Sequence, residues 1–280
     1  MQLIRRTIVT FTILGTAAAE GWPALWCPCD ACAKARKLGG KDIRRRSAYQ
    51  LDERIHIDFG PDSYAQMLEF GLSYHRLEHL LITHSHADHL FPTELQYRSR
   101  GFVPDGVGTE LTIHGNAHVE RRIRDEVDLA KCEARFVPVT LFEPIDLGEG
   151  VIATPLLADH AGDDEMAVNY LLEREGRALL QGNDSGWWPD ETWEFLATKT
   201  LDIALIECTY GPRDARRHHL GVNQVVEVRD ELLKLGTINS ETRVIATHFS
   251  HNGGWLYAQL EDFLRPHGIE VAWDGMQLEL

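Results

Sequence analysis

The stretch that decides the fold is LLITHSHADHLFP, residues 80–92, in which an apolar run leads directly into a cluster of histidines. Four candidate metal ligands stand within six residues of one another: His84, His86, Asp88 and His89. Residues two apart in an extended segment point to the same side, so His84 and His86 can bind one ion together. A turn after them lets Asp88 and His89 face a second ion. The motif therefore predicts a metal site at the end of a buried strand.

Three further candidates repeat this design, with a ligand-type residue at the carboxyl end of an apolar run. They are His160 in TPLLADH, Asp184 in LLQGNDSG and His248 in RVIATH. Each is a weak signal by itself, because a single histidine or aspartate at a strand end is more often a cap or a solvated turn residue. Together, five histidines and two aspartates supply three ligands for each of two metals and one carboxylate to bridge them.

Apolar, strand-like runs alternate along the chain with amphipathic stretches. The predicted strands are 7–14, 54–60, 79–84, 111–115, 151–160, 166–173, 178–184, 202–210 and 243–248. The predicted helices are 63–70, 89–98, 117–130, 188–197, 222–235 and 254–264. The closing segment GIEVAWDGMQLEL, residues 268–280, is predicted to form a terminal hairpin. Strands and helices interleaved in this way indicate a layered α/β fold with sheets inside and helices outside.

Composition limits the class of protein. The chain has 280 residues, of which 44% are hydrophobic, and it contains no low-complexity tract, internal repeat or linker, so we expect a single domain over residues 1–280. The sequence contains no run of about 18 apolar residues, so it predicts no membrane span. The formal net charge of −15 argues against a nucleic-acid partner, because such binding depends largely on Lys and Arg that neutralise phosphates.

The N-terminal stretch RRTIVTFTILGTAAAEG, residues 5–21, has the basic start, apolar run and small residues of an export signal. Thr7, Thr10, Thr12 and Gly15 interrupt the apolar run, however, which favours a β-branched strand over residues 7–14. We therefore expect a cytoplasmic protein that keeps this segment.

Three cysteines follow within six residues in WCPCDACAKAR: Cys27, Cys29 and Cys32. The chain has five cysteines, an odd number, and the other two lie far away in the sequence. A C-x-C-x-x-C spacing is too tight for a disulfide framework and suits three thiolates on one zinc ion in a reducing compartment. The alternative is that these are unremarkable reduced thiols. The zinc interpretation requires a fourth ligand from elsewhere in the chain.

The segment THSHADHL, followed by a strand-end histidine, a strand-end aspartate and a final histidine, resembles the metallo-β-lactamase superfamily of dinuclear hydrolases. The resemblance spans nearly the whole chain, including ILGTAAAEG, IDFGPD and VAWDGMQLEL. It implies an αββα sandwich with the site at one edge of the two sheets. It also implies the ligand sets: His84, His86 and His160 for the first metal, Asp88, His89 and His248 for the second, and Asp184 as the bridge.

The cysteines make the chain similar to one branch of that superfamily, the phosphoribosyl 1,2-cyclic phosphate phosphodiesterase of the carbon–phosphorus lyase pathway. In that branch a zinc knuckle takes its fourth ligand three residues beyond the last catalytic histidine, which here is His251. The resemblance also implies a catalytic role for His219, in RRHHLGVNQ, although its neighbour His218 leaves the choice between the two open. We count Asp88 as catalytic too.

The function implied is that of a metal-dependent phosphodiesterase. Two divalent ions, zinc or manganese or iron, would hold a hydroxide that attacks a small cyclic phosphodiester, while His219 binds a phosphate oxygen or protonates the leaving alkoxide. A structural zinc would occupy the knuckle. The alternatives are a tRNA 3′-processing endonuclease, a lactone or thioester hydrolase, and a non-catalytic metal-binding protein. The expected partner is the substrate alone, without nucleic acid or membrane, and a homodimer is compatible with the sequence.

Overall fold

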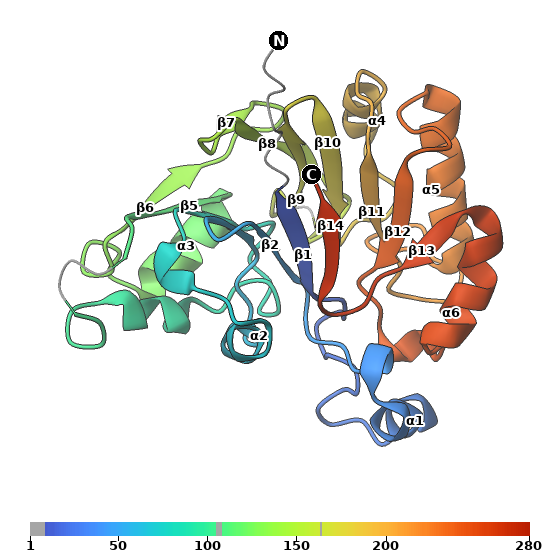
Figure 1. Cartoon of the computed structure of the whole chain (residues 1–280), viewed down its shortest axis with the longest axis horizontal. Helices are drawn as coiled ribbons and strands as arrows, with labels where there is room; N and C mark the ends of the chain where they lie inside the picture. Colours follow the sequence, from blue (N-terminus) through green and yellow to red (C-terminus); the bar gives the residue numbers. More distant parts are fainter. Residues whose placement is uncertain (1–8, 105–107, 163) are drawn as a thin grey trace, which may run out of the picture.

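Two facing β-sheets with helices on both outer sides make up the protein, in a computed structural model that describes residues 9–104, 108–162 and 164–280 (Figure 1). The first sheet has the order β14-β1-β2-β3-β4-β5-β6 and the second the order β13-β12-β11-β10-β9-β8-β7. The strands of the first are β1 (Thr10–Gly15), β2 (Ala48–Leu51), β3 (Ile55–Ile57), β4 (His79–Leu81), β5 (Leu111–Gly115), β6 (Ala134–Pro138) and β14 (Met276–Glu279). Those of the second are β7 (Ile145–Asp146), β8 (Val151–Leu157), β9 (Val168–Arg174), β10 (Arg177–Gly182), β11 (Ile203–Glu207), β12 (Arg243–Thr247) and β13 (Ile269–Val271).

Helices cover the outer face of each sheet. The α-helices are α1 (Asp30–Leu38), α2 (Ser63–Phe70), α3 (Ala117–Glu126), α4 (Asp190–Leu196), α5 (Val222–Leu235) and α6 (Tyr257–Leu264). The short 3-10 helices are η1 (Gly40–Asp42), η2 (Tyr74–Arg76), η3 (Pro92–Arg98), η4 (His251–Gly253) and η5 (Arg265–His267). Helix α3 packs on the first sheet, whereas α4, α5 and α6 pack on the second. This arrangement confirms the predicted αββα sandwich.

The alternation of side chains along each strand explains why the strands are apolar on both faces. In β11, Ile203 and Leu205 point into the core between the two sheets, whereas Ala204 and Ile206 belong to the core beneath the helices. A strand that is covered on both faces needs apolar residues at nearly every position, which gives the continuous runs seen in the sequence. Within the described ranges, every helix is too short or too polar to cross a bilayer.

The prediction of a C-terminal hairpin is wrong, because the two strands join different sheets. Strand β13 pairs with β12 in parallel, and β14 pairs with β1 in the antiparallel direction. The crossing between them is fastened at Asp274, whose carboxylate accepts hydrogen bonds from Thr16 Oγ1 at 2.7 Å and from the backbone N–H of Arg45 at 2.6 Å. A pattern of two strands around a turn fits either arrangement, and long-range pairing decides between them.

Other boundaries differ in ways that shape the site. Of the predicted strand 7–14, residues 7 and 8 lie outside the described part of the chain, and β1 continues to Gly15. The predicted helix over 89–98 is wrong, since its first residues belong to the loop with the histidine motif and only η3 follows, starting at a proline. Helix α1 and strands β2, β6 and β7 were not predicted from the sequence. Strands β4, β8 and β12 end before the histidines, which leaves those side chains in loops.

We predict that Leu205→Ala destabilises the protein by about 2–5 kcal/mol, because it leaves a cavity in the closed core between the sheets, where Leu205 is fully buried. Urea denaturation followed by circular dichroism measures the change in the free energy of unfolding. Leu233→Ala is the control, since Leu233 is 40% exposed on α5 and its loss should cost about 0.5 kcal/mol or less. Equal losses for the two variants would contradict this account of the core.

Candidate metal centre

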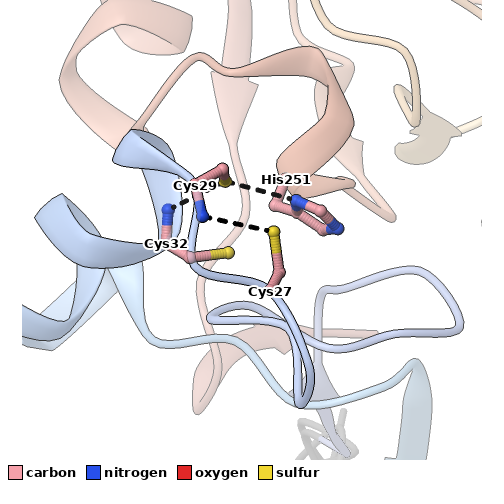
Figure 2. Close-up of side chains that lie close together, drawn as sticks. All are labelled: Cys27, Cys29, Cys32 and His251. Carbon is pink, nitrogen blue, oxygen red and sulfur yellow. Dashed lines mark hydrogen bonds between the residues drawn. The ribbon is translucent and has the colours of Figure 1, made fainter.

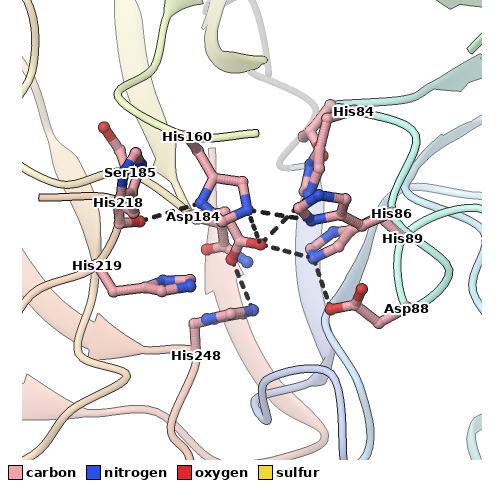
Figure 3. A network of polar contacts seen from close by, with 12 residues as sticks. His84, His86, Asp88, His89, His160, Asp184, Ser185, His218, His219 and His248 are labelled. Atoms are coloured by element: carbon pink, nitrogen blue, oxygen red, sulfur yellow. Dashed lines mark hydrogen bonds and ion pairs between the residues drawn. The ribbon is translucent and has the colours of Figure 1, made fainter. Parts of the chain in front are cut away.

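The strand-end histidines and aspartates come together at one edge of the sandwich, where the loops after β4, β8, β10 and β12 meet (Figure 3). They form two groups, in each of which the ligand atoms lie within 4.8 Å of one another. The first group is His84, His86 and His160, and the second is Asp88, His89, Asp184 and His248. All seven residues predicted from the sequence are therefore brought together.

Asp184 is the residue that contacts both groups. Its Oδ2 lies 2.9 Å from His89 Nε2 and 3.5 Å from His160 Nε2, and its Oδ1 lies 2.6 Å from His248 Nε2. The side chain is almost completely buried. A carboxylate in this position can bridge two cations that are held by the two groups.

Several polar atoms of the cluster are buried without a hydrogen-bond partner, as expected of side chains that bind a metal. The unpartnered atoms are the Nε2 atoms of His84, His89 and His248 together with Oδ1 of Asp184. Their short contacts therefore lack the geometry of hydrogen bonds. Buried polar groups nearly always have a hydrogen-bond partner, so these atoms need another kind of partner. Imidazole and carboxylate donors that converge in this way suit divalent zinc, manganese or iron. The residues fit a divalent metal.

Asp58, at the end of β3, orients one of these histidines. Its Oδ2 accepts a hydrogen bond from His89 Nδ1 at 2.7 Å, and its Oδ1 accepts bonds from the backbone N–H and the hydroxyl of Thr83, both at 2.9 Å. This contact fixes the His89 tautomer and turns Nε2 toward Asp184. Sequence reasoning missed Asp58, although it carries the same signal as the ligands, a carboxylate directly after an apolar strand.

Glu207, at the end of β11, plays the corresponding part on the second sheet. It is fully buried, and its Oε2 accepts a hydrogen bond from the backbone N–H of Thr209 at 2.9 Å. The Thr209 hydroxyl lies 2.8 Å from His248 Nδ1, so this pair fixes the second-sheet histidine as Asp58 fixes His89. The sequence analysis did not single out Glu207 or Thr209.

The structure distinguishes between His218 and His219. The ring of His219 lies 4.8 Å from that of His160 and 5.8 Å from that of His248, and its side chain is 19% exposed. His218 has a side chain that is 49% exposed and lies 3.9 Å from Asp159. Its carbonyl accepts a hydrogen bond from His160 Nδ1 at 3.1 Å. His219 therefore faces the metal centre, whereas His218 contributes its backbone.

Glu207 also controls the charge of His219. Burial lowers the pKa of His219, but the Glu207 carboxylate, 3.4 Å from Nδ1, and then Asp184 and Asp88 outweigh burial and raise the pKa to about 9. The raised pKa favours the protonated, hydrogen-donating form of His219. It borders a cavity of about 250 Å³ together with several of the candidate ligands. The lining residues are Ala18, Ala19, Glu20, His86, Asp88, His160, Asp184, Thr209, Tyr210, His219, His248, Ser250 and Asn252.

The cysteines form a second cluster beside the first helix (Figure 2). The ligand atoms of Cys27, Cys29, Cys32 and His251 lie within 4.8 Å of one another, with Cys29 Sγ 3.6 Å from His251 Nδ1. Cys29 caps α1, and the backbone N–H of Cys32, helped by His251 and against the effect of burial, lowers the pKa of Cys29 to about 6. The five cysteines, all within the described part of the chain, are free thiols. Three thiols and one imidazole at these distances could hold one metal ion.

Known proteins of similar structure share the whole architecture. A diphosphatase of the PhnP family superimposes with a TM-score of 0.74 at 24% sequence identity, covering 97% of this chain and 98% of that one. Zinc-bound PqqB from Methylobacterium extorquens superimposes with a TM-score of 0.70 at 15% identity, covering 97% and 100%. At these identities the likeness concerns the fold alone.

In sequence, the chain is 32% identical over 78 residues to ribonuclease Z of Parabacteroides distasonis, which is 28% of this chain and 25% of that protein. The chain thus matches only about a quarter of that relative's length. The family model described as the beta-lactamase superfamily domain matches residues 53–249, more than half of the chain. The resemblance stated from the sequence is therefore confirmed: the protein belongs to the beta-lactamase superfamily and has the fold and the buried histidine–aspartate cluster of a metal-dependent hydrolase.

Proposed function

We propose that the protein is a metal-dependent phosphodiesterase that hydrolyses a small cyclic phosphodiester, such as phosphoribosyl cyclic phosphate. The observation that carries the proposal is the position of His219. Its imidazole borders the same cavity as Asp88, Asp184 and His248, so a phosphate beside the metal groups would lie within reach of a histidine that can donate a proton. The cavity of about 250 Å³ suits a small substrate.

In this proposal, His84, His86 and His160 hold one catalytic divalent ion, Asp88, His89 and His248 hold the other, and Asp184 bridges the pair. When bound, two such ions lower the pKa of a water molecule and neutralise the charge that develops on a phosphoryl group. The imidazole and carboxylate donors accept zinc, manganese or iron. We propose zinc for the separate site formed by Cys27, Cys29, Cys32 and His251.

The chain's own residues then perform the proton chemistry. Glu207 holds His219 Nδ1, which leaves Nε2 to donate a hydrogen bond to a non-bridging phosphate oxygen or a proton to the leaving alkoxide. Asp88 borders the cavity and can orient the attacking water. His160, through its bond to the His218 carbonyl, keeps Nε2 toward Asp184.

A tRNA 3′-processing endonuclease is the second candidate, favoured by the short match to ribonuclease Z. Two features support the small substrate instead. The net charge of −15 opposes the approach of a polyanion, and the cavity is of small-molecule size. Cleavage of precursor tRNA at rates above those for small phosphodiesters would reverse the order of the two proposals. We further propose that the protein works in the cytoplasm, where the free thiols of its cysteine cluster would stay reduced.

We predict that Asp184→Ala abolishes hydrolysis of bis(p-nitrophenyl) phosphate and lowers the content of catalytic metal, because the two ligand groups lose the anion between them. Colorimetric assay and elemental analysis measure the two effects. Asp190→Ala, at the exposed start of α4, is the control and should match the wild type. Retention of both metals and of activity in Asp184→Ala would refute the bridging role. If the wild type opens lactones or thioesters but no phosphodiester, only the broader hydrolase function survives.

We predict that His219→Ala keeps both catalytic metals and loses about 10²- to 10⁴-fold in rate on a phosphodiester with an alkoxide leaving group. The loss should be much smaller on a nitrophenyl ester, because nitrophenolate leaves without a proton. Steady-state kinetics on the two substrates measure the difference. His218→Ala, with its exposed side chain, should be close to wild type. Equal losses on both substrates would assign His219 to phosphate binding rather than to proton donation.

We predict that Cys29→Ser loses one equivalent of zinc and lowers the stability of the fold while the histidine–aspartate cluster keeps its metals, since the two ligand sets share no residue. Elemental analysis and thermal unfolding measure these effects. Cys132→Ser, outside the cluster, is the matched control and should keep the full metal content. An unchanged zinc content in Cys29→Ser would rule out the structural site.

A further inference from the structure

Glu20, in the loop between β1 and the cysteines, contacts three consecutive residues that follow β12. Its Oε1 lies 3.4 Å from His251 Nε2 and accepts a hydrogen bond from Asn252 Nδ2 at 3.2 Å. The Ser250 hydroxyl donates to the same oxygen. One carboxylate therefore holds the residue that completes the cysteine cluster together with the residues on either side of it.

His251 has its two ring nitrogens directed at two different groups. Nδ1 faces Cys29 Sγ at 3.6 Å (Figure 2). Nε2 lies 3.4 Å from Glu20 Oε1. A histidine that binds a metal through one nitrogen commonly donates the N–H of the other to a carboxylate, which fixes its tautomer and strengthens it as a ligand. Glu20 is placed to do this for His251.

The same network forms part of the wall of the catalytic cavity. Glu20, Ser250 and Asn252 border that cavity alongside Asp88 and His248. The two loops that carry them are joined by backbone hydrogen bonds, from Ala18 N–H to the Phe249 carbonyl at 3.0 Å and from Phe249 N–H to the Thr16 carbonyl at 2.8 Å. A change at the cysteine cluster can thus reach the cavity through one side chain and one pair of loops.

We propose that Glu20 is a positioning residue that couples the ion in the cysteine cluster to the wall of the catalytic cavity. With that ion bound, the Glu20 carboxylate holds His251, Asn252 and Ser250 in one arrangement, and substrate binds against this arrangement. The role of the wall rests on the function proposed above, whereas the contact between Glu20 and His251 does not depend on it.

The test is Glu20→Gln in the full-length, metal-loaded protein. The amide keeps the size of the side chain but removes its charge, so zinc in the cysteine cluster should bind about 10- to 100-fold more weakly, as measured by competition with a chromophoric chelator. The same variant should raise KM for a small phosphodiester several-fold, with kcat nearly unchanged, because the catalytic ligands are untouched. Wild-type zinc affinity together with wild-type KM would overturn the proposal.

Three further variants separate the two halves of the coupling. Asn252→Ala removes the hydrogen bond from Asn252 to Glu20 but leaves the contact between Glu20 and His251, so it should raise KM and leave zinc affinity nearly unchanged. Glu191→Gln, on the exposed first turn of α4, should change neither quantity. Glu20→Asp keeps the charge and should recover part of the zinc affinity lost in Glu20→Gln; an affinity no better than that of Glu20→Gln would overturn the charge-based role.

The zinc competition does not require catalysis. If the wild type hydrolyses no phosphodiester, the proposed function fails while the competition experiment still decides whether Glu20 supports His251. Conversely, an active enzyme in which Glu20→Gln weakens zinc binding but leaves KM unchanged would overturn the coupling and keep the function.

Discussion

The site depends on the contacts between the buried Asp184 carboxylate and the imidazoles around it, which are those of His84, His89, His160 and His248. Burial raises the pKa of Asp184, whereas His248 and His89 lower it, and the net effect holds it well below its usual value. A buried anion of this kind is costly unless opposite charge surrounds it. Burial and the nearby His89 also lower the pKa of His84 well below its usual value, which leaves a neutral imidazole with a lone pair for a cation. Burial lowers the pKa of His89, but Asp184, Asp88 and Asp58 outweigh burial and raise it well above its usual value. The cluster therefore gathers positive charge, from a proton or from a metal ion, around one buried anion.

The sandwich supplies this arrangement through the ends of neighbouring parallel strands. Strands β3 and β4 are parallel neighbours in the first sheet, as are β11 and β12 in the second, so their carboxyl ends lie at the same edge. In each pair one strand leads to a metal-type histidine and its neighbour ends in a carboxylate that orients it. Asp58 orients His89 directly, and Glu207 acts on His248 through Thr209. Each sheet therefore orients one histidine through a carboxylate on the neighbouring strand, and Asp184 contacts both histidines.

The candidate ligands could be predicted because each has a signal within its own segment of the sequence. The signal is a histidine or aspartate at or just after the end of an apolar run. Asp58 and Glu207 have the same local signal but were missed, since their role appears only when a neighbouring strand is placed beside them. The choice between His218 and His219 depends on backbone geometry: His218 has a φ of 63°, in the left-handed region, and adjacent side chains there diverge. The C-terminal strands were misassigned for the same reason as Asp58, because pairing with distant β1 and β12 has no signature within the segment.

The backbone of the candidate metal centre is strained, and the cysteine cluster helps to hold the loop that carries one of the strained residues. Asp184 and His248 both lie in the left-handed region, at φ of 44° and 57°, where a non-glycine residue costs on the order of 1–3 kcal/mol and persists only if its surroundings hold it. His248 is the first residue after β12, in the loop that leads to η4. That loop is held by backbone bonds to residues 16–18 and by His251 in the cysteine cluster. An ion bound there would fix the end of the loop at His251, while β12 fixes the other end. His248, with its strained backbone, would then not relax away from Asp184.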